Sequence, residues 1–208
     1  MVYSDIIEEQ KDRLRVELKW WPNFFYHFTD VHNVVNILHS GWIMSREKVT
    51  STGMMVNDNA SRAVLNATNQ ENKRYGRLYF RPLTPTQYHN EGYKPEGVKD
   101  STLDASCPVP IFLCLNALAT LRYPGTLFAE KGLSGSRHDI REGVEEFAKL
   151  NFDKIYHEGS YDEDNRDIKD YRHSEVIRED GFPVEPLLQC ILCRTPAEKD
   201  TLLYLMEW

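Results

Sequence analysis

The stretch FFYHFTDVHNVVNILHSG, residues 24–41, carries the clearest structural pattern in this chain of 208 residues. Its aromatic first part, residues 24–28, favours a buried strand, because aromatic side chains pack well on a pleated surface. Thr29 and Asp30 are typical of the residues that cap a helix. The apolar side chains that follow at helical spacing share one face: Val31, Val34, Val35 and Leu38. Gly41 is suited to end this helix, so we expect a strand followed directly by a helix.

Weaker patterns on both sides extend this picture. Residues 4–19 favour a helix with acidic side chains early and Lys19 late. Thr195 and Glu198 match a capping box and predict a further helix. Strands are expected at residues 77–80, 111–115, 175–177 and 187–193, short helices at 61–69 and 142–150, and a loop at 86–106. No internal repeat and no regular alternation of strands and helices is seen, so the sequence predicts the α+β class.

The composition excludes several classes of protein. Hydrophobic residues make up 41% and aromatic residues 12% of the chain, too many for a disordered protein. No apolar run approaches the roughly 20 residues that span a bilayer, and residues 1–21 do not resemble a secretory signal. The net charge of −7 argues against tight coating of duplex DNA. Four cysteines without an export signal are expected to be reduced thiols of a cytoplasmic protein.

One pattern suggests a zinc-dependent nucleobase deaminase. His173 and Glu175, followed by Cys190 and Cys193, echo the H-x-E and C-x-x-C motifs of those enzymes. Gln189 stands where the motif has proline, however. The two cysteines also lie in an apolar strand, where side chains three residues apart point to opposite faces. Small buried thiols are therefore the favoured interpretation, and no metal site is expected.

Three polar residues lie beside predicted strands. His27 interrupts an aromatic strand, either as a core histidine bonded to backbone or as a group that faces a ribose or adenine. Glu175 begins a strand after a charged segment, either as an ion-pair partner or as a carboxylate held ready for a substrate. Arg81 stands at a strand end before Pro82, where a surface charge is the simplest expectation.

Four motifs taken in order resemble one family. They are YHFTDVHNVVNILHSG (26–41), YFRPLTPTQY (79–88), GTLFAEKG (125–132) and HSEV (173–176). Together they resemble the DarT-type ADP-ribosyltransferases, toxins that modify DNA bases and are paired with a DarG antitoxin. The resemblance covers roughly residues 20–195. The third motif departs from the family's usual Phe-Ser-Asp-Gly-Asn wording, since this chain has Phe-Ala-Glu-Lys-Gly.

The resemblance implies a fold and a substrate. The fold would be the ADP-ribosyltransferase fold, with two small, roughly perpendicular β-sheets around an NAD cleft and flanking helices. The chain would form one domain over residues 1–208, with an N-terminal helix in residues 1–20 and a target-recognition region at 124–172. NAD would be consumed as a substrate, and no metal would take part.

The same resemblance implies roles for particular residues. Glu175 would be the catalytic glutamate, and an arginine between the first two motifs would assist it. Arg62 is the preferred match for that arginine and Arg46 the second choice. Residues that would hold NAD are His27, Thr29, Asn33, Arg46 and Tyr79. Breaking the nicotinamide bond leaves an oxocarbenium-like ribose, which a fixed carboxylate stabilises.

A base must leave its stack before an enzyme can reach its edge, so single-stranded DNA is the expected target. Aromatic and basic side chains of the recognition region would contact the strand by stacking and charge: Tyr156, Tyr161, Arg166, Lys169 and Tyr171. The family divides between thymine and guanine, and the wording of residues 79–92 favours guanine.

Other functions stay open at this stage. The same fold could act on RNA or protein, or a degenerate relative could bind NAD or nucleic acid without turnover. The expected partners are single-stranded DNA and an antitoxin with ADP-ribosyl-hydrolase activity, with no membrane. The protein is expected to be a monomer.

Overall fold

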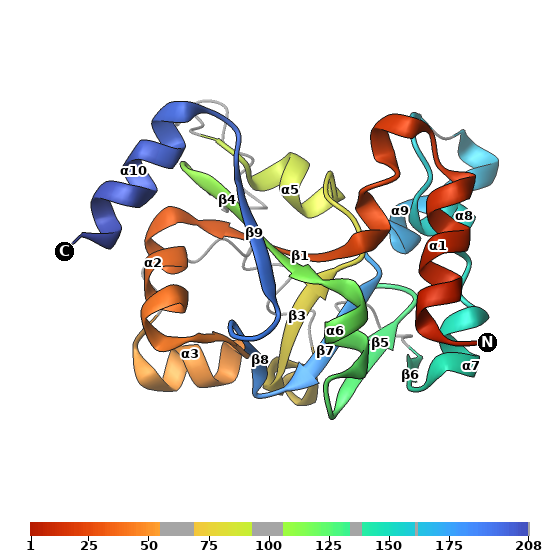
Figure 1. Cartoon of the computed structure of the whole chain (residues 1–208), viewed down its shortest axis with the longest axis horizontal. Coiled ribbons are helices and arrows are strands. Elements are labelled where there is room, and N and C mark those ends of the chain that lie inside the picture. Colours follow the sequence, from red (N-terminus) through yellow and green to blue (C-terminus); the bar gives the residue numbers. More distant parts are fainter. Residues whose placement is uncertain (55–68, 93–105, 134–138, 161, 208) are drawn as a thin grey trace.

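The computed structural model describes residues 1–54, 69–92, 106–133, 139–160 and 162–207. In this part of the chain, seven strands form one antiparallel sheet in the order β6-β5-β7-β3-β1-β4-β9, and β2 pairs with β8 (Figure 1). The strands are β1 Phe24–Asp30, β2 Trp42–Met44, β3 Tyr75–Tyr79, β4 Pro110–Asn116, β5 Thr126–Ala129, β6 Ile140–Arg141, β7 Glu175–Glu179, β8 Gly181–Pro183 and β9 Leu188–Cys193. The predicted α+β class is confirmed, although one of the two sheets is larger than expected.

The stretch that decides the fold is arranged as predicted. β1 runs directly into helix α2, Val31–Ser40. Asp30 caps this helix by accepting a hydrogen bond from the backbone N–H of His32 at 3.1 Å. Gly41 ends it with a φ of 72°, a left-handed conformation that glycine adopts without strain. β1 pairs with β4 along its whole length, from Phe24 opposite Asn116 to Asp30 opposite Pro110.

The large sheet divides into two halves at the junction of β1 and β3. Within the described residues, these two strands pair at one position, Tyr26 opposite Tyr79. Beyond it, the His27 ring nitrogen Nδ1 lies 3.2 Å from the carbonyl oxygen of Arg77 and adds a side-chain link. We call β1, β4 and β9 the β1 half, and β3, β7, β5 and β6 the β7 half.

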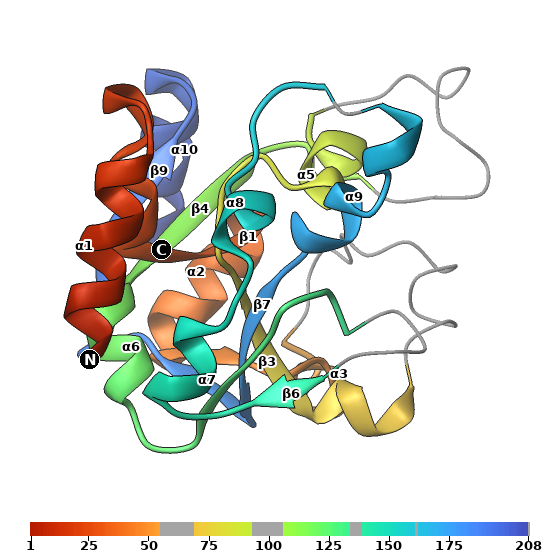
Figure 2. The ribbon, with the colours of Figure 1, turned by 90° about the vertical axis from the view of Figure 1, so that its right-hand side faces the viewer.

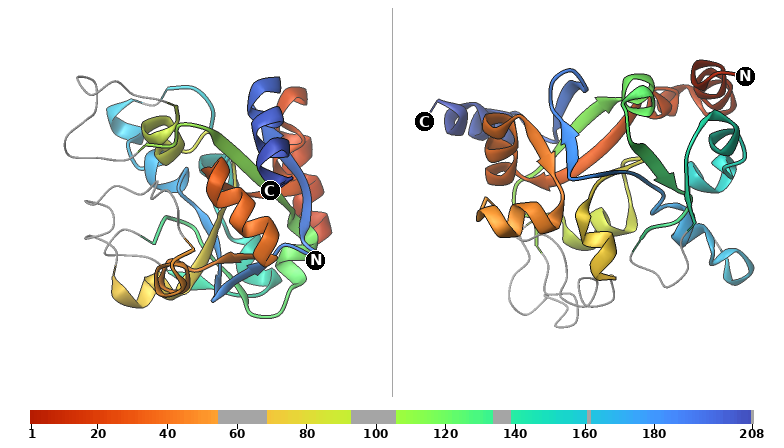
Figure 3. Two further views of the ribbon diagram at one scale, coloured as in Figure 1. Left: turned by 90° about the vertical axis from the view of Figure 1, so that its left-hand side faces the viewer. Right: turned by 90° about the horizontal axis from the view of Figure 1, so that it is seen from below.

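Helices surround both halves. They are α1 Tyr3–Arg13, α3 Arg46–Thr52, α5 Pro85–Asn90, α6 Ala117–Arg122, α7 Val144–Ala148, α8 Phe152–Ile155, α9 Ile168–Tyr171 and α10 Pro196–Met206. Short 3₁₀ turns occupy Val16–Leu18, Trp21–Asn23, Gln70–Arg74 and Glu163–Asn165. The terminal helices α1 and α10 lie at opposite ends of the molecule (Figure 3). None of the described helices is long and apolar enough to cross a membrane.

The predicted end of the N-terminal helix and the start of the loop predicted at residues 86–106 are wrong. The N-terminal helix ends at Arg13 rather than residue 19, because Leu14 has an extended backbone. Residues 85–90 form α5 instead of a loop, since the Thr84 hydroxyl accepts a hydrogen bond from the Gln87 N–H and Pro85 occupies the first turn. The helix expected at 61–69 lies almost wholly outside the described residues.

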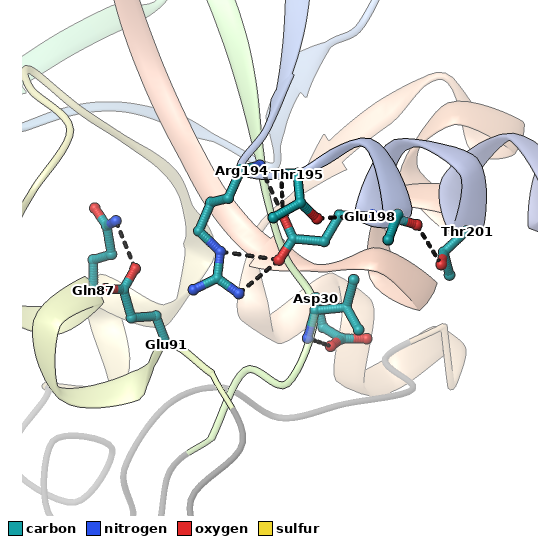
Figure 4. A network of polar contacts seen from close by, with 9 residues as sticks. Asp30, Gln87, Glu91, Arg194, Thr195, Glu198 and Thr201 are labelled. Carbon is teal, nitrogen blue, oxygen red and sulfur yellow. Dashed lines mark hydrogen bonds and ion pairs between the residues drawn. The ribbon is translucent and has the colours of Figure 1, made fainter.

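The capping box predicted for α10 is confirmed. The Thr195 hydroxyl accepts a hydrogen bond from the Glu198 N–H, and the Glu198 carboxylate accepts one from the Thr195 N–H, both at 3.2 Å. The Arg194 guanidinium also donates to Glu198, at 2.6 and 2.9 Å (Figure 4).

The N-terminal helix α1 packs against α7, which belongs to the segment between β6 and β7. Figure 2 shows the side of the molecule on which these helices lie. The Tyr3 and Phe147 rings meet edge to face with centroids 5.4 Å apart. Arg13 forms an ion pair with Asp153 at 2.5 Å, and Arg15 pairs with Glu158. These contacts join the start of the chain to a segment that is more than 130 residues away in sequence.

Candidate active site

Glu175 lies at the centre of the candidate site. It is the first residue of β7, between Tyr79 on β3 and Ala129 on β5. The residue is 4% exposed. Its Oε2 accepts a hydrogen bond from the backbone N–H of Leu133 at 2.9 Å, and its Oε1 lies 3.6 Å from Nη1 of Arg77. A paired strand and two side-chain contacts therefore fix the carboxylate in place.

Tyr79 faces the same region from the neighbouring strand. Burial and, next, the charge of Glu175 raise the pKa of the Tyr79 phenol to about 12. A hydrogen bond with Thr86 and the charge of Arg77 act in the opposite direction. The phenol thus keeps its proton at neutral pH and can donate a hydrogen bond.

His27 occupies the junction of the two sheet halves. The Arg77 carbonyl can only accept a hydrogen bond, so Nδ1 carries the ring proton and Nε2 is an acceptor. Burial lowers the pKa of His27, and the hydrogen bond to Arg77 opposes part of that shift. The ring is therefore neutral near pH 7. The bond to backbone that the sequence suggested is present, and it also orients Nε2.

Thr29 and Asn33 form a polar pair where β1 meets α2. The Asn33 amide donates to the Thr29 hydroxyl oxygen at 3.0 Å, and Thr29 is buried. Thr29 and His27 are two residues apart on one strand, so their side chains share a face of the sheet. Arg46 is half-buried in the first turn of α3. Arg62 lies outside the described residues.

The recognition residues expected at 124–172 differ in exposure. Tyr156 is in the core, 6% exposed and stacked on Phe152 with centroids 6.1 Å apart. Because its ring is enclosed, it has no face for a nucleic acid base. Tyr171 is half-buried, and the ammonium groups of Lys131 and Lys154 lie 4.9 and 5.2 Å from its ring centroid.

Two more of these expected contacts lie in the charged stretch. Arg166 is exposed and forms an ion pair with Glu163 at 2.6 Å. Lys169 is exposed in α9. Tyr161 lies outside the described residues.

The prediction that Arg81 is a surface charge is wrong. The residue is 3% exposed rather than a surface charge. Its guanidinium lies 4.7 Å from the Trp21 ring centroid and donates to the carbonyls of Ile155 and His157, at 3.2 and 2.5 Å. Burial and, next, the charge of Arg172 lower the pKa of Arg81 to about 10, so the side chain stays charged at neutral pH. It fastens the end of β3 to the α8 region.

The residues of the deaminase pattern are not brought together. Cys190 and Cys193 are on β9, which β3, β1 and β4 separate from Glu175 on β7. Four strand spacings amount to roughly 19 Å, too far for a shared metal ion. In the described ranges, no group of three or more His, Cys, Asp or Glu side chains is arranged to hold a metal.

The sequence matches the model of one known protein family. A family model described as "ssDNA thymidine ADP-ribosyltransferase, DarT" matches residues 26–207. No curated protein matches the sequence significantly.

Solved structures show the same fold at low identity. The chain is similar to Thermus sp. 2.9 DarT in complex with NAD+, with 18% identity, a TM-score of 0.66 and 89% of each chain covered. The Thermus protein in complex with ADP-ribosylated ssDNA gives a TM-score of 0.71, with 18% identity and 89% and 88% of the two chains covered. Thermosipho africanus DarTG in complex with ADP-ribose gives 0.68 at 14% identity, covering 89% of this chain and 48% of that one. These matches confirm the fold expected from the four motifs.

Proposed function

The chain belongs to the DarT family of ssDNA thymidine ADP-ribosyltransferases, and on that premise we propose that it transfers ADP-ribose from NAD+ to a thymine base of single-stranded DNA. The observation that carries the proposal is the fixed carboxylate of Glu175. This residue lies on β7 opposite Tyr79 on β3, and β3 is the neighbour of β1, the strand that holds His27. The family's description favours thymine over guanine, the base that the wording of residues 79–92 suggested.

The proposed reaction divides the site into two tasks. His27, Thr29 and Asn33 hold the adenosine-side ribose of NAD+ through hydrogen bonds that are equally strong before and during the reaction. The bond between the nicotinamide nitrogen and the ribose C1′ breaks, and neutral nicotinamide leaves with the bonding electron pair. Glu175 stabilises the positive charge that develops on the ribose.

Transfer is completed by the base. A ring nitrogen of thymine attacks C1′, and its proton passes to the Glu175 carboxylate, which then releases it to water. Glu175 suits this role because a strand holds it, whereas a carboxylate on a loop would need to be ordered first. Arg62, and Arg46 as the second choice, remain the proposed arginines on the NAD side.

The proposed DNA contacts follow the exposure of the recognition residues. Tyr171, Arg166, Lys169 and Tyr161 are retained as strand contacts. Tyr156 is withdrawn because the structure encloses its ring. Base stacking on aromatic rings is worth about 1–3 kcal/mol per base, which can offset the repulsion between DNA and an acidic protein.

Mass spectrometry of oligonucleotides tests the proposal directly. The protein is incubated with NAD+ and, in separate reactions, single-stranded DNA, its duplex and the matching RNA, with Glu175→Gln as the control of strongly reduced activity. We expect one ADP-ribose on thymine of the single strand. Modification of guanine would restore the preference drawn from residues 79–92. Modification of RNA or protein alone, or no turnover, would contradict the proposed target.

The proposal extends to the cellular location, the oligomeric state and the partner of the protein. The protein would act in the cytoplasm as a monomer and a toxin, restrained by an antitoxin that removes ADP-ribose. The described cysteines are free thiols, which is compatible with a reducing compartment. The family model covers residues 26–207, which supports one catalytic domain with α1 as an N-terminal addition.

A further inference from the structure

The carboxylate of Glu175 is one member of a closed ring of contacts. The Leu133 N–H donates to Glu175 Oε2 at 2.9 Å, and the Leu133 carbonyl accepts a hydrogen bond from the Asn72 side-chain amide at 3.2 Å. The Asn72 backbone carbonyl accepts a hydrogen bond from Arg77 Nη2 at 3.1 Å. Arg77 Nη1 returns to Glu175 Oε1 at 3.6 Å, which completes the ring.

This ring brings together segments that are far apart in sequence. Asn72 is in the 3₁₀ turn before β3, Arg77 is on β3, Leu133 follows β5, and Glu175 begins β7. Asn72, Leu133 and Glu175 are all at most 4% exposed, so the contacts among them are shielded from water, whereas the Arg77 side chain is 25% exposed. A hydrogen bond to a charged group is stronger than a neutral one, more so where water is excluded.

The two oxygens of the carboxylate are held by different arms. One arm runs through the Leu133 backbone to the Asn72 side chain, and the other runs through Arg77 to the Asn72 backbone. The two arms together restrict rotation of the carboxylate, because Oε2 accepts a hydrogen bond from Leu133 and Oε1 forms an ion pair with Arg77. A functional side chain keeps its productive geometry only when supporting contacts of this kind hold it in place.

We propose that Asn72 and Arg77 are positioning residues that hold the Glu175 carboxylate in its catalytic orientation. The inference rests on the proposed function, since it takes Glu175 as the group that stabilises the reacting ribose. Asn72 is linked to the carboxylate through the backbone of Leu133. The Asn72 side chain donates to the Leu133 carbonyl, whereas its backbone carbonyl accepts from Arg77, so Asn72→Ala removes the first bond and keeps the acceptor of the second.

The test is a double-mutant cycle on nicotinamide release from NAD+, a readout that does not depend on which target is modified. We expect Asn72→Ala to lower kcat about 10-fold to 100-fold with the NAD+ dissociation constant unchanged, because a misplaced group loses rate rather than affinity. Arg77→Gln should act similarly, and Arg77→Lys should recover part of the rate. In the Glu175→Gln background, Asn72→Ala should have no further effect, because its path to the reaction is already broken.

A control separates positioning from simple support of the fold. Asn116→Ala removes another asparagine that bonds to backbone, the cap of α6, on the β1 half. It should lower Tm without lowering kcat. The proposal is overturned if Asn72→Ala slows the parent enzyme and the Glu175→Gln enzyme by the same factor. It is also overturned if a loss of folded protein or of NAD+ affinity accounts for the whole fall in rate. Nicotinamide release without modified DNA would contradict the proposed target and still allow the cycle to be read.

Discussion

The β1 half and the β7 half of the sheet secure their polar residues by different means. β1 is paired with β4 over seven residues, and that regular ladder fixes the backbone of His27 and Thr29. The β7 half has shorter pairings, five residues between β3 and β7 and four between β5 and β7. There, side-chain contacts between distant segments hold the key carboxylate. The geometry of the residues proposed to hold NAD+ thus depends mainly on strand pairing, whereas the geometry of the proposed catalytic carboxylate depends on a few individual contacts.

The largest effect that follows from this comparison concerns Glu175. Glu175→Gln removes the charge at nearly constant volume, so the β7 half should fold and NAD+ should still bind. The rate of transfer should fall about 10²–10³-fold, the cost typical of losing one electrostatic contact to a transition state. Calorimetric titration with NAD+ and single-turnover kinetics measure the two quantities. A variant within tenfold of the parent rate would make Glu175 a structural residue.

A smaller effect is expected at Tyr171, which separates DNA contact from NAD+ binding. Tyr171→Leu keeps an apolar side chain but removes the ring over which Lys131 and Lys154 lie. The KM for single-stranded DNA should rise roughly tenfold, since one stacking contact is worth about 1–3 kcal/mol. Tyr156→Phe, in the enclosed core, is the matched control and should leave this KM unchanged. Equal KM values for Tyr171→Leu and the parent would remove Tyr171 from the DNA path.

His27→Ala should show the complementary behaviour of the β1 half. Its proposed contact with NAD+ is present in both the ground state and the transition state, so KM for NAD+ should rise while kcat changes little. We expect a rise of about tenfold, the equivalent of one hydrogen bond of about 1.4 kcal/mol. Steady-state kinetics over a range of NAD+ concentrations distinguishes the two constants. Loss of kcat at unchanged KM would place His27 at the reacting ribose instead.

The smallest effect concerns pH and compares both halves. Burial lowers the pKa of His27 in the β1 half and of His157 and His173 beside the β7 half, relative to 6.5 in the unfolded chain. The folded state then binds fewer protons than the unfolded state, so stability is present above pH 6.5 and is lost as the pH falls below it. His27→Gln should reduce this acid sensitivity, as measured by Tm between pH 7.5 and about 5. An unchanged slope would show that the loss comes from the β7 side.

Local signals explain which parts of the fold could be predicted. The strand and helix of residues 24–41 follow from side chains that act within a few residues, and so does the cap at Thr195. The helix α5 had the same signal, since Thr84 and Gln87 repeat the spacing of Thr195 and Glu198. The surrounding turn residues concealed it. The predicted N-terminal helix is too long, because helix propensity alone does not indicate the extended backbone at Leu14.

Contacts over long sequence distances explain what could not be predicted. Arg81 looks like a surface charge because its partners, Ile155 and His157, are 74 and 76 residues away. Arg77 meets Glu175 only because β3 and β7 become neighbours in the sheet. No nearby residue signals either contact. The motifs identified Tyr79 and Glu175, and only the strand register shows that they lie opposite each other.

The single paired position between β1 and β3 has a consequence for how such a protein can change over generations. Substitutions in one half have few backbone hydrogen bonds through which to disturb the other, and effects at sites without shared partners are close to additive. Residues proposed to recognise the target could therefore be exchanged one at a time while β1 keeps its shape. A lineage with this arrangement could acquire new targets in gradual steps while the proposed NAD+ contacts of β1 are retained.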